Sequence, residues 1–454
     1  MISALLLGIA TAGTCWAGSR SLRQGLAALL LVGYVYGIVR ANLADTYAYL
    51  LFDGAVLGLY AAQLWRPLAA QDRQRLHNLR LWLILLIGWP VLLFLLYRTD
   101  DPLVELVGLR SNIFLLPFLF LGARLRNNDV RYLATVVAFL NIGATILGAV
   151  EFFVGVDAFF PKNEITEIIF KSRDLVGWTA YRIPSSFASS HAFAGTLVVT
   201  LPLLVGAWVQ RDTDKWESYI FPAAIVASLL GVFMAAARQH MITAALLVVV
   251  ITFTGQLQRK HWIKWAVVVL AVAYVVAGDA RLQRFSTLAD TELVSERITN
   301  SVNRDFFQLM ADHPMGNGLA GGGTSIPYFL RDRARPAIGL ENEYARIMLE
   351  QGIPGLFIWA VFIFWVLLRR PGVRRSPWHV SRTLAWWTAC AAFGSAFIGT
   401  GMLTSVPQSA IFLLTTGWIS VPAAADDLAI PVFAEPRAPI PARRDRRMAP
   451  AALR

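Results

Sequence analysis

Long apolar runs constrain this chain more than any other feature of its sequence. A helix that crosses a bilayer needs about 20 mostly apolar residues, and runs of this kind recur from the first residues to about position 422. Hydrophobic residues make up 56% of the 454 residues and charged residues only 15%, which is too few to cover a water-facing surface of this size. We therefore expect an all-α, polytopic membrane bundle of about 12–13 transmembrane helices with one long helical outer loop.

Thirteen segments are candidate spans by this criterion. The first lacks the basic start of a signal peptide and is kept as a span, whereas the fifth could lie partly in the membrane interface. The spans lie near residues 2–16, 24–42, 44–65, 79–97, 107–125, 132–154, 190–210, 218–236, 240–256, 262–278, 352–368, 383–402 and 406–422.

The basic residues predict which side of the membrane each loop occupies. If the N-terminus faces outward and every span crosses once, one set of loops and the C-terminal tail hold 25 Lys and Arg against 9 Asp and Glu. The rest of the chain holds 16 basic and 20 acidic residues. Because cytoplasmic loops carry the excess of Lys and Arg, we interpret the net charge of +12 as a marker of topology. A nucleic-acid surface is not expected, since no basic globular domain is present.

This topology divides the chain into six parts. N-terminal transmembrane helices are followed by a first outer loop and by further transmembrane helices. A large outer loop, in which we expect the catalytic residues, then precedes C-terminal transmembrane helices and a basic tail. The tail is rich in Pro, Ala and Arg, so we expect a disordered cytoplasmic end. The boundaries are 1–156, 157–189, 190–278, 279–351, 352–422 and 423–454.

The first half of the large outer loop predicts a helix that presents two arginines. Apolar residues recur with helical spacing between 292 and 312. Arg297 and Arg304 lie on a neighbouring stripe, about two turns apart, where both guanidinium groups can face one region of space. The helix should end at His313, because a residue before a proline avoids the α conformation.

The end of the same loop predicts a second helix, over residues 341–351, with Gly352 as a stop signal. Glu341 precedes the small Ala345 by one turn, which would leave room for a substrate beside the carboxylate. It could equally favour the helix N-terminus through the dipole, and both interpretations stay open. Glu343 and Arg346 have the spacing of an exposed i,i+3 salt bridge.

Several other charged or polar residues lie in or near apolar spans. Arg238 stands between two of them with almost no loop, so it is either a functional or paired charge or a side chain that reaches the headgroups. Ser190 and His191 are adjacent and lack the third member of a hydrolase triad. Asp53 and Glu151 are either a proton or ion relay or simply hydrogen-bonding groups between helices.

No metal or cofactor is predicted. The two cysteines lie inside apolar runs, and Asp312 and His313 lack further ligands at suitable spacing. The acidic pair of residues 212 and 214 lies in a short polar loop and is interpreted as solvated charge. The glycines of residues 316–323 follow no predicted strand, which argues against a dinucleotide site.

Four segments together resemble the O-antigen ligase and polymerase superfamily of bacterial membrane glycosyltransferases. They follow in the order of that family and all lie in or beside the outer loops. The matching segments are Arg182–Phe187 with 189–195, Ala236–Arg238, Arg297 through Asp312–Gly318, and Glu341–Tyr344 with Glu350–Leu356. Two positions depart from the family pattern, because Glu341 stands where the family has a histidine and the family's S-R-G is Ala-Arg-Gln here.

The resemblance implies a multi-pass protein of the bacterial inner membrane with its active site facing the periplasm. It implies transfer of a glycan from a polyprenyl-diphosphate donor to a sugar hydroxyl of a glycan or lipid-linked acceptor, in exopolysaccharide or O-antigen biosynthesis. Ligases of the family are described as relying on the histidine that Glu341 replaces. A polymerase is therefore slightly favoured over a ligase that joins glycan to lipid A core or to protein.

Site roles follow from the resemblance and from the chemistry of a diphosphate leaving group. Fixed guanidinium groups stabilise the charge that develops on such a group, and a carboxylate can accept the proton of the acceptor hydroxyl. We expect a metal-independent, inverting transfer in which Glu341, Arg238 and Arg297 are catalytic. The expected substrate-binding residues are Arg182, Arg304, His313, Asn342, Tyr344 and Arg346.

A transporter of polysaccharide or lipid-linked oligosaccharide is the alternative from another functional class. It would use Asp53 and Glu151 as its charges inside the membrane. Transporter folds commonly show repeated halves, and no internal repeat is visible in this sequence.

Overall fold

The computed structural model describes residues 1–66, 73, 76–96, 101–171, 182–210, 216–253, 306–321, 323, 326–333, 342–371, 378–397, 399 and 402–422. The secondary structure of these residues is helical, and they contain no strand, which confirms the predicted all-α class. The first helices are α1 (Ile2–Arg20), α2 (Leu22–Leu43), α3 (Thr46–Tyr49), α4 (Leu51–Leu64), α6 (His77–Leu96), α7 (Pro102–Ile113), α8 (Pro117–Ala123) and α9 (Asn127–Val154). They are followed by η1 (Val156–Ala158), α10 (Glu167–Lys171), α11 (Ser190–Val209), α12 (Glu217–Met234), α13 (Arg238–Phe253), α16 (Phe306–Asp312), η5 (Tyr328–Arg333), α17 (Glu343–Leu368), α18 (His379–Ser395) and α19 (Gln408–Ile419).

Eight helical segments within the described ranges are long and apolar enough to cross a membrane. They agree with eight of the predicted spans, and the chain is a multi-pass membrane protein. These segments are α1, α2, α6, α7 with α8, α9, α11, α12 and α17.

The remaining predicted spans are shorter, interrupted or outside the described residues. Residues 44–65 do not form one span, because the chain divides at Leu50 into α3 and α4. The fifth span, already counted among the eight, is formed by two helices, because α8 begins at Pro117 after α7 has ended at Ile113. The helices α13, α18 and α19 have 16, 17 and 12 residues, and the span predicted at 262–278 lies outside the described residues.

The helix α11 is the centre of the bundle. Most of its length is buried, and it contacts α9, α12, α13, α18 and α19. A wholly apolar helix surrounded by other helices exposes little surface to lipid. The N-terminus of α11 is therefore fixed by several neighbours, and it carries the residues of the candidate site described below.

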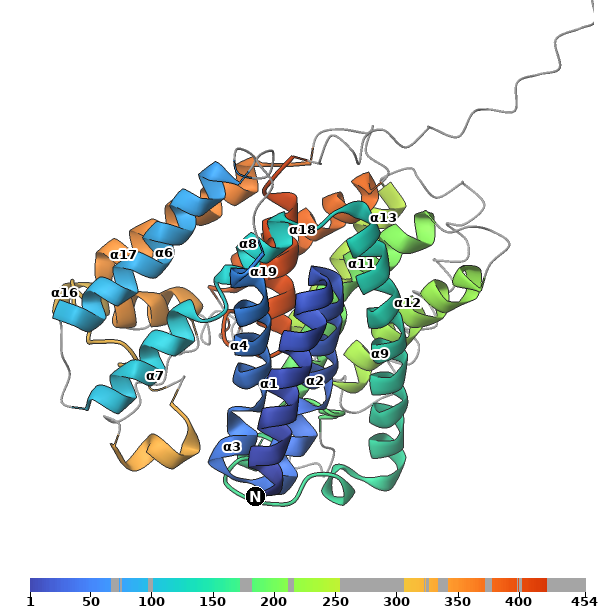
Figure 1. The fold of residues 1–454 in the computed structure, drawn as a ribbon, viewed down its shortest axis with the longest axis horizontal. Helices are drawn as coiled ribbons and strands as arrows, with labels where there is room; N and C mark the ends of the chain where they lie inside the picture. The colour runs from blue at the N-terminus through green and yellow to red at the C-terminus, as the bar shows by residue number, and fades with distance from the viewer. Residues whose placement is uncertain are drawn as a thin grey trace, which may run out of the picture.

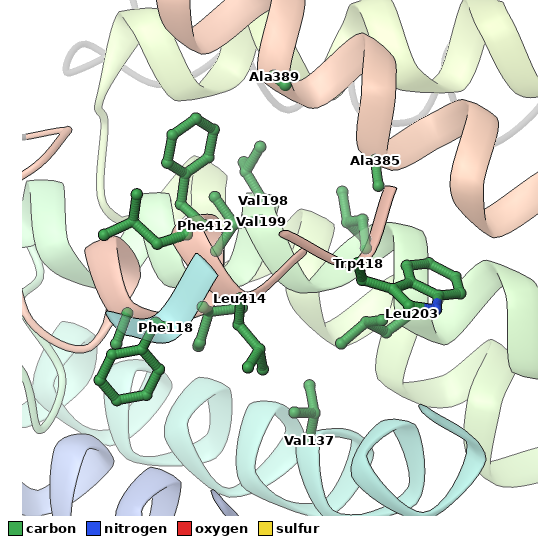
Figure 2. Packing of buried hydrophobic residues seen from close by; sticks show 14 of the residues in the cluster. Phe118, Val137, Val198, Val199, Leu203, Ala385, Ala389, Phe412, Leu414 and Trp418 are labelled. Carbon is green, nitrogen blue, oxygen red and sulfur yellow. The ribbon is translucent and has the colours of Figure 1, made fainter. Parts of the chain in front are cut away.

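Close backbone packing holds α8 against α19 behind this centre. A Cβ atom at Gly122 would lie 1.8 Å from the carbonyl oxygen of Leu414, and one at Gly417 would lie 1.9 Å from that of Leu119. Only glycine permits this approach, which is a common way for membrane helices to gain packing contacts. The side chains of Phe118, Leu414 and Trp418 then fill the space around the contact (Figure 2).

A second group of helices forms one flank of the molecule. In Figure 1, α6, α7, α16 and α17 lie together on the left, beside the body that contains α1, α2, α4, α9, α11 and α12. One contact of this flank with the rest of the molecule lies where α17 begins. The first turn of α17 is hydrogen-bonded there to the end of α18. This junction brings the motifs from distant parts of the sequence together.

Candidate active site where α11, α13 and α17 begin

Arg182 lies at the start of a turn that is fixed between two membrane helices. The backbone N–H of Ser185 donates to Glu151 Oε2 at 2.8 Å, and the Ser185 hydroxyl donates to the carbonyl of Ala144 at 2.7 Å. Ser185 has a φ of +52°, a conformation that is uncommon for a residue with a side chain. The turn therefore depends on α9 for its shape, and Glu151 serves as a hydrogen-bond acceptor between segments.

The same turn lies directly on α2. A Cβ atom at Gly37 would lie 1.9 Å from the carbonyl carbon of Phe187, so no side chain fits there. The backbone N–H of Ile38 donates to the carbonyl of Ser186 at 3.0 Å. This hydrogen bond joins the turn to α2 and fixes the segment that carries Arg182.

Arg182 reaches a cluster of polar side chains at the N-terminal ends of three helices. Its Nη1 lies 3.3 Å from Nε2 of His191 in α11. The rings of His191 and of His240 in α13 have centroids 6.0 Å apart, and Nε2 of His240 lies 3.4 Å from Nε2 of Gln408 in α19. We call these four residues the histidine–arginine cluster.

Arg238 and Asn342 are brought to the same place by the end of α18. Arg238 is the first residue of α13, and the adjacent Gln239 donates from Nε2 to Ser395 Oγ at 2.6 Å. One residue further, the carbonyl of Ala396 accepts the backbone N–H of Glu343 at 3.0 Å. The starts of α13 and α17 thus both lie at the end of α18.

Asn342 and Tyr344 fix the first turn of α17. Asn342 Oδ1 accepts the backbone N–H groups of Tyr344 and Ala345 at 2.8 and 3.2 Å, which is the geometry of a helix N-cap. The Tyr344 hydroxyl donates to the carbonyl of Phe393 at 2.7 Å. These contacts hold the turn in place and give both residues a structural role beside the predicted role in binding substrate.

Arg346 is the centre of a buried charged network. It donates to Glu343 Oε1 through Nη2 at 2.6 Å and to Glu350 Oε2 through Nη1 at 2.7 Å. The three side chains are at most 2% exposed. The expectation of an exposed Glu343–Arg346 salt bridge is therefore wrong, because every residue of α17 from Glu343 to Gly352 is buried.

Asn112 of α7 completes this network. Its Nδ2 donates to Glu350 Oε2 at 2.8 Å, and its Oδ1 accepts Gln351 Nε2 at 2.8 Å and Arg346 Nη1 at 3.3 Å. One Glu350 oxygen, Oε1, has no hydrogen-bond partner among the described residues. We call Asn112, Glu343, Arg346, Glu350 and Gln351 the charged network; it joins α7 to the first turns of α17.

The glycine-containing segment after α16 binds to a break in α17. α16 ends at Asp312, as predicted from the proline that follows His313. Gly352 interrupts α17 with φ +71° and ψ −175°, at the position predicted as a stop, although α17 continues beyond it. The freed N–H of Ile353 donates to the carbonyl of Pro314 at 2.9 Å, and Asn317 N–H donates to the carbonyl of Leu349 at 2.6 Å.

The structure places some predicted site residues and leaves others outside the described part. Arg297, Arg304 and Glu341 are among the latter, so their roles stay predictions. Arg182, Arg238 and Asn342 lie in elements that meet at the ends of α11, α13, α18 and α17. His313 lies at the Gly352 break, and Arg346 in the charged network. Over the part of the chain described here, no group of three His, Cys, Asp or Glu residues could hold a metal ion.

Two further residues at the site, His240 and Glu350, were not predicted from the sequence. His240 lies two residues after Arg238, and its histidine neighbour becomes visible only when α11 and α13 pack together. Glu350 stands at i+4 from Arg346, so its helix spacing was a usable signal. Its partner Asn112 is 238 positions away in the sequence, and no pattern predicts that contact.

The residues that the transporter alternative would use have structural partners. Asp53 is bound by Arg110 through both carboxylate oxygens, with Arg110 Nε 2.7 Å from Oδ2. Glu151 accepts the N–H of Ser185, as described above. Both contacts correspond to the interpretation of these residues as groups that join helices.

The site is suited to bind an anion. The helices α11, α13 and α17 all begin in it, and a helix N-terminus carries a partial positive charge and unpaired N–H groups. The sequence adds Arg182 and Arg238 at the same ends. Guanidinium groups bind phosphate oxygens through paired hydrogen bonds, so a diphosphate is a suitable ligand on chemical grounds.

Comparisons with known proteins bear on the family of the chain. No curated protein matches the chain significantly. A family model described as O-antigen ligase matches residues 223–360, a range that includes Arg238, the Gly352 break and the charged residues of α17. The match within this range supports the place of the chain in the O-antigen ligase and polymerase superfamily.

Proposed function

We propose that the chain is a membrane glycosyltransferase that transfers a glycan from a polyprenyl-diphosphate donor to a sugar hydroxyl of a second glycan or lipid-linked acceptor. The proposed setting is the periplasmic face of the bacterial inner membrane, in the synthesis of a surface polysaccharide. A polymerase is preferred, and a ligase is the alternative. The observation that carries the proposal is the meeting of the Arg182 turn, the start of α13 at Arg238 and the start of α17.

The proposed reaction is a single displacement at the anomeric carbon, with inversion and without a metal. The acceptor oxygen forms a bond to this carbon as the bond from the carbon to the diphosphate oxygen breaks, and that electron pair leaves with the polyprenyl diphosphate. The proton of the acceptor hydroxyl passes to Glu341 and then to water. Arg238 and Arg297, supported by Arg182 and Arg304, stabilise the charge on the departing diphosphate.

Guanidinium groups suit this task better than ammonium groups. A guanidinium presents a planar fork that can bind two phosphate oxygens at once, whereas a lysine presents a point charge. Positioned charges of this kind are often the largest contribution to catalysis in phosphate and acyl transfer. Arg238→Lys should therefore remain well below the wild type although the charge is retained.

The test is complementation of a strain that lacks this chain. Arg182→Ala, Arg238→Ala and Glu341→Gln should abolish polymer formation and cause the lipid-linked donor to accumulate, at normal protein levels. Arg369→Ala is the matched control, because Arg369 lies at the far end of α17, where its Nη1 donates to the carbonyl of Ser420. Unchanged polymer in the Arg238 and Glu341 variants would refute the assigned roles.

The products of the deletion strain distinguish a polymerase from a ligase. Loss of long polymer with lipid-linked single repeats retained indicates a polymerase. Loss of glycan on lipid A core, or on protein, with long lipid-linked polymer retained indicates a ligase. Uptake of substrate into vesicles without any glycan transfer would instead support the transporter alternative.

A further inference from the structure

The proposed reaction gives no role to three members of the histidine–arginine cluster, and His191 is the exposed one of the three. It is the second residue after the N-cap Ser189 and is exposed at the start of α11, whereas most of α11 is buried. Its only hydrogen bond to a described residue joins Nε2 to Nη1 of Arg182. His191 therefore presents an exposed imidazole beside Arg182, an arginine that is proposed to bind the diphosphate.

The contact with Arg182 determines which nitrogen of His191 carries the proton. An arginine side chain has donors and no acceptor, so Nη1 donates and Nε2 of His191 accepts. A ring nitrogen that accepts has no proton. The ring is then neutral with its N–H on Nδ1, because a protonated ring would lose this hydrogen bond and place two cations together.

The neighbouring His240 is held by a contact of its own. His240 is 9% exposed and packs beside His191. The amide of Gln408 lies at Nε2 of His240. A Cβ atom at Gly195 would lie 2.0 Å from Gln408 Oε1, so the amide is closely confined by α11. With the Gln408 amide nitrogen as donor, His240 also carries its proton on Nδ1, and this nitrogen has no partner among the described residues.

The charged group in contact with His191 is Arg182 of the turn, which is basic. Arg238 begins α13, two residues before His240, and Glu151 of α9 accepts the N–H of Ser185. The nearest part of α19 contributes the uncharged Gln408. No described carboxylate is hydrogen-bonded to His191, so nothing favours the protonated ring.

We propose that His191 is a further catalytic residue, which donates an Nδ1–H hydrogen bond to the diphosphate oxygen that departs from the anomeric carbon. This inference rests on the proposed function and assigns His191 to the leaving-group side of the reaction. The hydrogen bond strengthens as negative charge develops on that oxygen, so it stabilises the transition state more than the bound donor. His191 remains neutral throughout and takes no proton from the acceptor.

Two amide replacements separate donation at Nδ1 from every other role of the ring. The Asn side chain places its amide nitrogen where the ring has Nδ1, and the Gln side chain places it closer to Nε2. The full chain in nanodiscs is assayed with lipid-linked donor extracted from the deletion strain. His191→Asn should retain turnover within a few-fold of the wild type, whereas His191→Gln and His191→Ala should lower kcat about 10²- to 10³-fold with little change in KM.

Other outcomes overturn the assignment. If His191→Asn is as defective as His191→Ala and the remaining activity recovers at high pH, His191 accepts a proton, and the donor role is wrong. If all three variants match the wild type, the residue has no catalytic role. Folding is controlled by thermal unfolding of each variant in the same nanodiscs.

The same assay distinguishes failure of this inference from failure of the proposed function. If the wild type transfers no glycan, or if Arg238→Ala is fully active, the proposed function itself fails. If Arg238→Ala is inactive while the His191 variants do not follow the expected order, only the role of His191 fails.

Discussion

Arg346→Met tests the charged network, because it removes the cation and retains most of the volume of the side chain. Glu343 and Glu350, both without exposed surface, would lose their shared partner. Breaking a buried ion pair by removal of one member costs about 3–5 kcal/mol. The variant should therefore be much less stable than the wild type.

A second route to this magnitude uses the proton. A buried carboxylate that has lost its cation can become neutral by taking up a proton, and at pH 7 this costs about 4 kcal/mol for a carboxyl group with an ordinary pKa near 4.3. This protonation cost is therefore the largest loss of folding free energy that each unpaired carboxylate can cause. Glu350 keeps its hydrogen bond from Asn112 Nδ2, so we expect a total loss of about 4 kcal/mol.

The assay is thermal unfolding of the full chain in nanodiscs, followed by tryptophan fluorescence. Arg369→Met is the matched control, and it should change stability by less than about 1 kcal/mol because its arginine is partly exposed. The Glu343→Gln, Arg346→Met, Glu350→Gln triple variant should regain most of the stability, since no unpaired charge remains. Equal stability of Arg346→Met and the wild type would refute the reasoning, and so would a triple variant less stable than the single one.

Three further predictions concern positions where the structure fixes the backbone or a charge. Gly37→Ala should abolish glycan transfer, because its Cβ would overlap Phe187 at 1.9 Å. Gly88→Ala is the control and should retain transfer, because a Cβ there would have nothing within 4 Å. Equal activity of the two variants would contradict the close contact. Gly352→Ala should cost more than about 1 kcal/mol of stability, because φ is +71° there, and an unfolding temperature equal to that of Gly88→Ala would count against it. Burial raises the pKa of Asp101, but hydrogen bonds from Arg333 and from two backbone N–H groups outweigh this effect and leave the pKa below its ordinary value. The ionised carboxylate therefore stabilises the fold above about pH 4, and this contribution fades as the pH falls through the lowered pKa. Asp101→Asn should make the unfolding temperature depend less on pH between neutral and acidic conditions. A pH profile equal to that of the wild type would disprove the coupling.

The membrane architecture could be predicted from the sequence because it depends on composition over long windows. Eight predicted spans correspond to helices of spanning length. The interruptions were harder to predict, since Leu50 and the segment before Pro117 are apolar themselves and only their neighbours, such as Asp45 and Arg110, are polar. A hydropathy window averages over one residue in a changed conformation, and tertiary contacts decide where the helix stops.

The candidate site shows a similar division. The end of α16 at Asp312 and the break at Gly352 follow from local rules for proline and glycine. The burial of Arg346 was missed because i,i+3 spacing identifies a pair but not what covers it. The contact of Arg182 with His191 was missed for another reason, since both residues were noticed but only the folded turn brings them together.

The pairing of Pro314 and Asn317 with α17 around Gly352 has a consequence for chimeras made between related proteins. Two backbone hydrogen bonds couple these segments, and their close approach also requires glycine at position 352. A chimera that imports a foreign outer loop but keeps the native α17 would have to reproduce this backbone pairing in register. Grafts that carry residues 313–318 and 349–353 as one cassette should therefore be tolerated where either piece alone is rejected.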